Sequence, residues 1–188
     1  MCIKRTNWSY DLDKCLAEWD QIKLYPDMRW ITFMDGTSQT YIQRNPKILS
    51  NPFIGGDGDN RRRRGFRPPG RPRISPSVKV DLDYNMLNEI YEGSLFEDII
   101  RDVNGVRSRI MVKTAHTTYS VHRDKILRYH LALITNPNAY FIFPTMNEII
   151  HIPADGYVYE VDTTLLHSFV NCGPADRTHL VISKRSSS

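Results

Sequence analysis

Cysteines, long apolar runs and an apolar leader are scarce or absent in this sequence of 188 residues. The three cysteines (Cys2, Cys15 and Cys172) are odd in number and widely spaced, so they fit neither a disulfide framework nor a CxxC metal site. No apolar run approaches the roughly 18–20 residues that a membrane-spanning helix needs. The first residues contain no apolar segment typical of a secretory signal. These absences predict a cytoplasmic protein with no membrane partner.

Acidic residues are missing from one segment of the chain. Residues 61–73 hold seven arginines and no acid, whereas the net charge of the whole chain is only +4. The 25 Lys and Arg residues less these seven leave 18 bases against 21 acids, so the rest of the chain is mildly acidic. The tract either contacts nucleic-acid phosphates or an acidic partner, or it is a solvated loop. Only Phe66 supplies an aromatic ring there, which is few for a single-strand binding platform.

A chain of this length with 40% hydrophobic residues can bury one substantial core, so we expect a single domain over residues 1–188. Apolar residues recur at helical spacing over 9–22, where Ser9 or Asp11 is available as the N-cap. The same spacing recurs over 85–103. We therefore predict two amphipathic helices, of which the second packs against the outer face of a sheet.

Short runs separated by turn residues make up most of the remaining sequence. The Asp35-Gly36 pair between runs 30–34 and 39–42 predicts a hairpin, and residues 78–82 predict a short strand. Eight further strands are predicted at 109–114, 117–123, 128–135, 139–143, 148–152, 157–161, 166–170 and 178–183. Many short strands with regular turns predict a mainly β fold with flanking helices, either a β-sandwich or a jelly-roll barrel.

The residues with the clearest chemistry lie in the second half of the chain. His122 and Asp124 are two apart in a predicted strand, so their side chains project from the same face. His167 follows another strand-like run far along the chain. Two imidazoles and one carboxylate on one face, with coordination positions left open, form the ligand set of non-haem Fe(II) oxygenases.

Arg177 indicates that the same site also binds a carboxylate. A hairpin between His167 and Arg177 places this arginine on the strand next to the one that carries the histidine. A guanidinium inside a barrel needs a carboxylate, because a buried unpaired cation is very costly. A small diacid bound to the metal at one end and to Arg177 at the other end meets this need, since arginine binds carboxylates through two donors.

The stretches YSVHRDKILRYHLALITNP (119–137) and GYVYEVDTTLLHSFVNCGPADRTHLVI (156–182) resemble the aspartyl/asparaginyl β-hydroxylase family of Fe(II)/2-oxoglutarate oxygenases. The resemblance covers residues 108–184 and consists of a His, an R-x-H-L strand, a second His and an Arg ten residues later. It implies a double-stranded β-helix, which is the cupin-like form of the jelly roll. It also implies a dioxygenase that uses O2 and converts 2-oxoglutarate to succinate while hydroxylating a free amino acid or a protein residue.

The resemblance implies a role for individual residues. His122, Asp124 and His167 match the iron ligands, and Arg177 matches the partner of the distal carboxylate of 2-oxoglutarate. Three further residues match or adjoin positions around the cosubstrate, namely Arg128, His130 and His179. The name-giving mammalian enzymes have Gly where this chain has Asp124, so the sequence is closer to the bacterial proline-hydroxylase-like branch, which keeps H-x-D.

These matches divide the single domain into an N-terminal helix and hairpin (1–43), a Pro-, Gly- and Arg-rich loop (44–77), a supporting strand and helix (78–105) and a catalytic core (106–184). Other functions stay open at this point. A cupin metalloenzyme that does not use 2-oxoglutarate needs the same metal ligands but gives Arg177 no diacid. A nucleic-acid-directed oxygenase or a binding module would act through residues 61–73.

Overall fold

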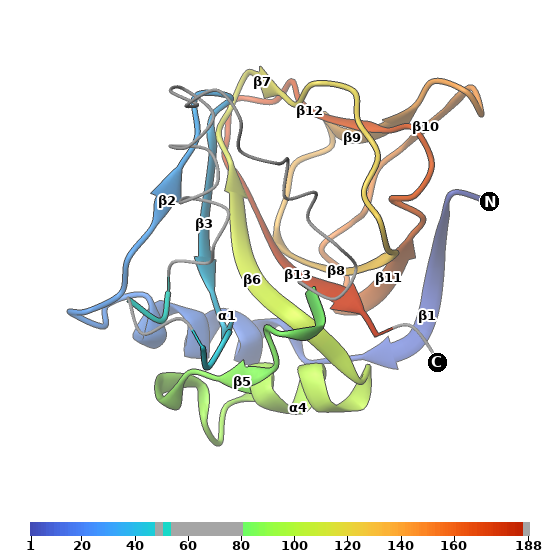
Figure 1. The fold of residues 1–188 in the computed structure, drawn as a ribbon. Coiled ribbons are helices and arrows are strands. Elements are labelled where there is room, and N and C mark those ends of the chain that lie inside the picture. Colours follow the sequence, from blue (N-terminus) through green and yellow to red (C-terminus); the bar gives the residue numbers. More distant parts are fainter. Residues whose placement is uncertain (48–50, 54–80, 186–188) are drawn as a thin grey trace, which may run out of the picture.

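The structure is a computed structural model that describes residues 1–47, 51–53 and 81–185. Two antiparallel sheets make up most of it (Figure 1). The arginine tract 61–73 and most of the loop 44–77 lie outside the described residues. No helix in the described part of the chain is both long and apolar enough to cross a membrane.

The larger sheet has seven strands in the order β1-β11-β8-β13-β6-β3-β2. These strands are β1 (Ile3–Ser9), β11 (Tyr157–Val161), β8 (Arg128–Ile134), β13 (Arg177–Lys184), β6 (Gly105–Lys113), β3 (Thr37–Tyr41) and β2 (Ile31–Thr32). The smaller sheet has the order β10-β9-β12-β7. Its strands are β10 (Glu148–Ile150), β9 (Ala139–Phe143), β12 (Ser168–Asn171) and β7 (Thr117–Thr118). The strands β4 (Gln43–Arg44) and β5 (Met86–Leu87) pair with each other in a separate two-stranded sheet.

The connections between the sheets identify the fold. From β6 onward the chain alternates between the larger and the smaller sheet, except that β9 and β10 form a hairpin within the smaller one. Four strands of each sheet, β6-β13-β8-β11 and β7-β12-β9-β10, therefore form a double-stranded β-helix. The predicted fold is confirmed, and each of the eight predicted strands from residue 109 onward has a counterpart. The boundaries of the predicted segments within the domain stay predictions.

The two α-helices with described bounds pack on the outer face of the larger sheet. The helix α1 (Leu12–Ile22) begins after Asp11, whose carboxylate accepts from the Lys14 backbone N–H at 3.1 Å, as expected for an N-cap. Buried side chains of α1 and α4 (Leu95–Asp102), such as Trp19 and Ile99, share one core with Leu131 of β8. Figure 1 shows both helices on one side of the sheet, which leaves its inner face to the barrel interior.

The predicted helix over 85–103 is wrong in its first half. The structure has β5, a 3-10 turn at Glu89–Tyr91 and then the shorter helix α4. Gly93 at φ +72° interrupts any continuous helix, and Ser94 caps a new one by accepting from the Glu97 backbone N–H at 3.4 Å. The apolar residues still reach the same core, although they do so from three separate elements.

Two other parts of the N-terminal half differ from prediction. The strand β1 was not predicted, because apolar residues do not alternate along it; it pairs with β11 at the sheet edge, where Ile3 lies opposite Val161. Of the predicted strand 78–82 the structure describes only Asp81 and Leu82, and both residues are helical. The Asp81 carboxylate there forms a buried ion pair with Arg107.

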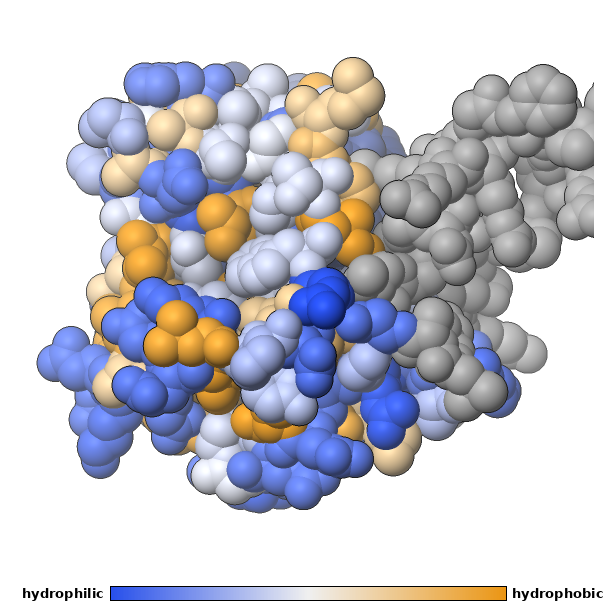
Figure 2. All heavy atoms as spheres, turned by 90° about the vertical axis from the view of Figure 1, so that its left-hand side faces the viewer, coloured by the Kyte–Doolittle hydropathy of each residue, from blue (hydrophilic) through white to orange (hydrophobic). Residues whose placement is uncertain are grey.

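The Asp-Gly hairpin is confirmed, with β2 and β3 as its strands and Gly36 at φ +74° in its turn. This hairpin extends the larger sheet beside β6. Figure 2 shows the side of the molecule on the left of Figure 1, where hydrophobic patches are separated by hydrophilic ones. The apolar side chains between the two sheets form a second core cluster, which includes Ala132, Phe141, Val161 and Phe169.

Candidate metal centre

Two histidines from distant parts of the sequence lie side by side in the barrel. The backbone N–H of His122 donates to the carbonyl of His167 at 2.9 Å, and the reverse hydrogen bond has the same length. This antiparallel bridge brings the ring centroids to 4.5 Å from each other. The strand predicted at 117–123 is shorter than expected, since β7 ends at Thr118, but the bridge keeps the second half of the segment extended beside residue 167.

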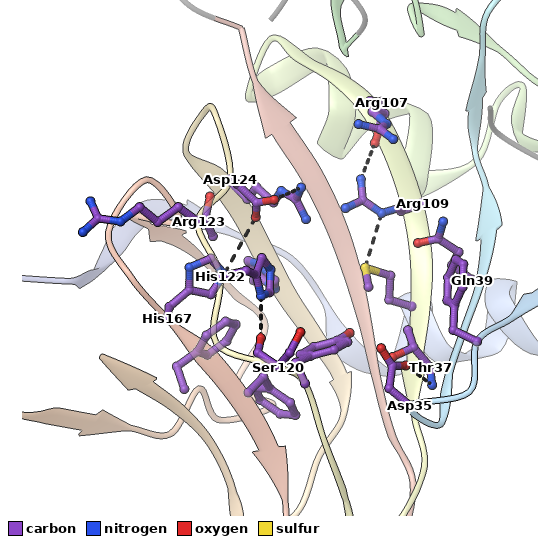
Figure 3. A pocket seen from close by; sticks show the side chains of 18 of the residues that line it. Asp35, Thr37, Gln39, Arg107, Arg109, Ser120, His122, Arg123, Asp124 and His167 are labelled. Carbon is purple, nitrogen blue, oxygen red and sulfur yellow. Dashed lines mark hydrogen bonds and ion pairs between the residues drawn. The ribbon is translucent and has the colours of Figure 1, made fainter. Parts of the chain in front are cut away.

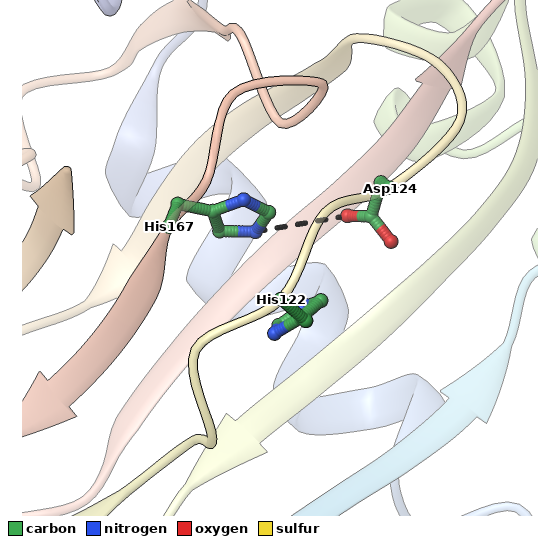
Figure 4. A group of neighbouring side chains, drawn as sticks. All are labelled: His122, Asp124 and His167. Carbon is green, nitrogen blue, oxygen red and sulfur yellow. Dashed lines mark ion pairs between the residues drawn. The ribbon is translucent and has the colours of Figure 1, made fainter. Parts of the chain in front are cut away.

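Asp124 completes a group of three possible metal ligands. Its backbone N–H donates to the Thr163 carbonyl at 2.8 Å, which holds the loop after β7 against the segment before β12. Its Oδ2 lies 3.8 Å from His167 Nε2, and one ligand atom of each of the three residues lies within 4.8 Å of the others. Figure 4 shows the two imidazoles and the carboxylate turned toward a common centre.

The tautomers of both histidines follow from their hydrogen bonds. His122 Nδ1 lies 2.7 Å from the Ser120 carbonyl oxygen, and His167 Nδ1 lies 2.9 Å from that of Leu165. A carbonyl oxygen only accepts, so each Nδ1 carries the proton and donates it. Each Nε2 is therefore left with a lone pair, and such backbone contacts are what orient metal-binding histidines.

The two oxygens of the Asp124 carboxylate differ in their hydrogen bonding. Asp124 Oδ1 accepts from Arg128 Nη2 at 2.7 Å. Oδ2 is buried and has no hydrogen-bond partner among the described residues. A buried anionic oxygen without a partner is costly, and a divalent cation between Oδ2 and the two Nε2 atoms removes this cost. The donor set therefore fits a divalent metal.

The three side chains lie in a cavity of about 480 Å³. Figure 3 shows His122, Asp124 and His167 on one wall and Gln39 and Arg109 on the opposite wall. The described lining also includes Thr37, Arg107, Met111, Tyr119, Arg123, Lys125, Arg128, His130, Phe141, Phe169 and Arg177. The wall away from the three candidate ligands is built by β3 and β6.

Arg177 is the largest fully buried side chain in the described part of the chain and lines the same cavity. The predicted hairpin between His167 and Arg177 is wrong, because β12 lies in the smaller sheet and β13, which begins at Arg177, in the larger one. Its guanidinium lies 4.2 Å from the ring centroid of Phe169, and Nη2 donates to Nδ1 of His179. It forms no ion pair with any described residue, and its Nε has no partner there. Burial lowers the pKa of Arg177 to about 9. The site therefore holds a cation that lacks an anion.

His130 and His179 lie close to this cation. Their ring centroids are 5.8 Å apart, and both side chains are almost fully buried. Burial, reinforced by the charge of Arg177, lowers the pKa of each well below its usual value of 6.5, so both are neutral at pH 7. Both ring nitrogens of His130 are buried without a partner among the described residues. His130 lines the cavity, whereas His179 contacts Arg177 but is not among the lining residues.

The structure thus brings all seven predicted site residues together, although their metal-binding and cosubstrate-binding roles stay predictions. It also adds a residue that the sequence analysis missed. Lys113 on β6 is fully buried, donates to the Asp35 carbonyl and lies 4.3 Å from the Tyr119 ring centroid. The sequence did contain a signal: the two basic residues of the predicted strand 109–114, Arg109 and Lys113, are four apart and so project from the same face.

The family comparison agrees with this geometry. The sequence model of the family "Aspartyl/Asparaginyl beta-hydroxylase" matches residues 95–185. The matched stretch is just under half of the 188 residues. It contains α4 and every strand of the double-stranded β-helix, and it includes His122, Asp124, His167 and Arg177. No curated protein is detectably similar in sequence to this chain.

Several solved structures are similar in shape to this chain at low sequence identity. A prolyl-4-hydroxylase from Pseudomonas putida is 10% identical, with a TM-score of 0.49 over 99% of this chain and 94% of that one. A prolyl hydroxylase from Trichoplax adhaerens, in complex with a peptide fragment of the hypoxia inducible factor oxygen degradation domain, is 11% identical, with a TM-score of 0.48 over 97% and 81%.

The complex of Rhodobacter sphaeroides SigE with the anti-sigma ChrR is 13% identical, with a TM-score of 0.40. The match covers 88% of this chain and 54% of that one, so this chain spans about half of its length. All three TM-scores lie below 0.5, and the fold assignment rests on the strand order.

Proposed function

We propose that this chain is an Fe(II)- and 2-oxoglutarate-dependent dioxygenase that hydroxylates a free amino acid or an amino-acid residue of a protein. One observation carries the proposal: the cavity that holds His122, Asp124 and His167 also holds Arg177 buried without an acid among the described residues. The family match supports a hydroxylase.

His122 and His167 would hold the iron through Nε2, and Asp124 through Oδ2. Three protein ligands leave coordination positions open for a bidentate cosubstrate and for O2. Iron bound in this way supplies the oxidative chemistry in which 2-oxoglutarate is decarboxylated to succinate and a C–H bond of the substrate is hydroxylated. The hydrogen bonds to the Ser120 and Leu165 carbonyls hold the proton on Nδ1 and orient both rings, so that Nε2 faces the proposed iron.

Arg177 would bind the distal carboxylate of 2-oxoglutarate. A carboxylate in this position supplies the missing counter-charge, and the fork of the guanidinium can donate two hydrogen bonds to it. His179 accepts from Nη2 and so holds the guanidinium in one orientation. The aromatic rings of Phe141 and Phe169 exclude water around the charge, which strengthens the ion pair with the cosubstrate.

The wall of β3 and β6 is left for the amino-acid substrate. It presents buried polar side chains, Thr37 and Gln39, together with Met111. Such a mixture of hydrogen-bonding and apolar groups suits a small polar substrate or a single residue of a protein. The contact of residues 61–73 with nucleic acid has no support in the structure or the comparisons, and the cytoplasmic location stays a prediction.

Succinate formation tests the proposal. The protein is reconstituted with Fe(II) under anaerobic conditions, and O2 and 2-oxoglutarate are then added with candidate amino acids and peptides. We expect wild-type protein and the His116→Asn control, whose side chain is exposed and outside the described cavity lining, to form succinate. His167→Ala and Arg177→Ala should form none above background. Equal succinate formation by His167→Ala would contradict the proposed site.

A further inference from the structure

The direction of the Asp124 carboxylate depends on one neighbour. The backbone around it is fixed, because its N–H donates to the Thr163 carbonyl at 2.8 Å and Thr163 Oγ1 donates to the Ile126 carbonyl at 2.6 Å. These contacts leave the side-chain torsions of Asp124 unrestrained. The only side chain in the described part of the chain that bonds its carboxylate is Arg128.

Arg128 is itself rigidly placed. It is the first residue of β8, where it lies opposite Val161 of β11 on one side and Ser183 of β13 on the other. Its Nη2 donates to Asp124 Oδ1 at 2.7 Å, and the side chains of both residues are only 16% exposed. Charge-assisted hydrogen bonds at this depth are among the stronger polar contacts in proteins.

We propose that Arg128 is a positioning residue for the metal ligand Asp124, which it confines to binding through one oxygen. This inference rests on the proposed function. With Oδ1 bonded to the guanidinium, only Oδ2 faces His167 Nε2, at 3.8 Å. A carboxylate that binds through both oxygens takes four coordination positions together with the two histidines, whereas a single oxygen leaves three of the six open.

The inference differs from the role that the sequence resemblance implies for Arg128. That resemblance places Arg128 at the cosubstrate, but the name-giving mammalian enzymes have no carboxylate at the position of Asp124. In this chain the carboxylate is present, and the arginine bonds it. The two roles predict different effects of substitution: a positioning role changes the affinity for the metal even when no cosubstrate is present, whereas a cosubstrate role changes only the affinity for 2-oxoglutarate.

Mn(II) binding to the apo-protein, followed by electron paramagnetic resonance without cosubstrate, separates the two roles. We expect Arg128→Gln to raise the dissociation constant of Mn(II) about 10- to 100-fold, as is usual when a partner of a metal ligand is lost. Arg128→Lys, which keeps a charged donor, should recover part of this loss. The matched control is Arg101→Gln, which removes an exposed arginine paired with Asp98 on α4 and should leave the dissociation constant unchanged.

A double-mutant cycle shows whether the effect passes through Asp124. In an Asp124→Ala background, Arg128→Gln should have no further effect on Mn(II) binding, whereas a general structural role makes the two losses additive. The proposal is overturned if Arg128→Gln binds Mn(II) like wild type, or if the losses add. If wild-type protein binds no Mn(II), the metal site itself is wrong and the proposed function fails with it.

Discussion

Buried cationic and imidazole side chains gather on the inner face of the larger sheet, where a barrel more often buries apolar residues. Lys113, His130, Arg177 and His179 are each at most 5% exposed. Lys113 has partners in the β2–β3 turn, but Arg177 has only a neutral histidine among the described residues. A buried cation without an anion destabilises the folded chain, and under the proposed function the cosubstrate carboxylate offsets this cost.

Replacement of Arg177 should therefore separate stability from binding. Arg177→Met keeps much of the volume and removes the buried charge, so we expect the free energy of unfolding to rise by about 1–3 kcal/mol. The same variant should bind 2-oxoglutarate at least ten-fold more weakly, because the distal carboxylate loses its charged partner. Urea unfolding and calorimetric titration measure the two effects. A variant that is less stable than wild type would show that Arg177 is a structural residue.

The two buried histidines predict how stability depends on pH. In the folded chain the pKa values of His130 and His179 are well below 6.5, whereas in the unfolded chain they are near 6.5. As the pH falls below 6.5, the unfolded chain binds protons that the folded chain does not, so the free energy of unfolding decreases. The decrease is at most about 1.4 kcal/mol for each pH unit and each histidine.

Urea unfolding of the metal-free protein between pH 7.5 and 5.5 measures this slope. His179→Gln should unfold with a shallower dependence on pH than wild type, because one of the histidines whose pKa is lowered in the folded chain is gone. His116→Asn, which removes an exposed histidine, should keep the wild-type slope. Parallel slopes for His179→Gln and wild type would contradict the neutral state assigned to His179.

At the scale of elements, the strands were easier to predict than the helices. The eight strands of the double-stranded β-helix are short apolar runs between clear turn residues, and local sequence determines them well. The helix predicted over 85–103 failed because helical spacing of apolar residues arises equally when three short elements pack on one core, as Leu87, Tyr91 and Ile99 do. Only Gly93 marked the interruption.

The β2–β3 hairpin supplies one wall of the cavity, and its turn has a strict steric requirement. A Cβ on Gly36 would lie 2.3 Å from Thr114 Oγ1 and 2.7 Å from Thr117 Cγ2, whereas a Cβ on Gly93 would meet nothing within 4 Å. Both glycines have positive φ, so each substitution by alanine costs about 1–2 kcal/mol from backbone strain alone.

Gly36→Ala should therefore destabilise the protein clearly more than its matched control Gly93→Ala, in urea unfolding at pH 7.5. The difference reports the collision with Thr114 and Thr117, which join the hairpin to the end of β6. Because Thr37 and Gln39 line the cavity, Gly36→Ala should also weaken substrate-dependent succinate formation. Equal destabilisation by the two variants would show that the turn can move away without loss.

At the scale of the whole molecule, the site combines segments that sequence alone could not bring together. The H-x-D pair, the distant His167 and Arg177 were predicted because their types and order match a known ligand set. The opposite wall, from β3 and β6, was not predicted, because it depends on the packing of a hairpin outside the family-matched residues 95–185. Under the proposed function, the identity of the substrate depends on that wall.

The metal and the cosubstrate should each stabilise the folded chain, and the cosubstrate should do so only after the metal is bound. At 100 times its dissociation constant, Mn(II) should add about 2.7 kcal/mol to the free energy of unfolding, which corresponds to a rise in Tm of about 5–10 °C. 2-Oxoglutarate should raise the Tm further only when the metal is present. Thermal unfolding followed by tryptophan fluorescence measures both steps. A cosubstrate effect of equal size without metal would contradict a shared site.

The most direct test of the central claim is an anaerobic calorimetric titration of 2-oxoglutarate into the purified protein, with and without Fe(II). We predict binding that requires Fe(II), is lost in His167→Ala, and is at least ten-fold weaker in Arg177→Ala. If 2-oxoglutarate does not bind in the presence of Fe(II), or binds equally well to Arg177→Ala, then Arg177 does not hold a cosubstrate carboxylate and the chain is not a 2-oxoglutarate oxygenase of the kind proposed.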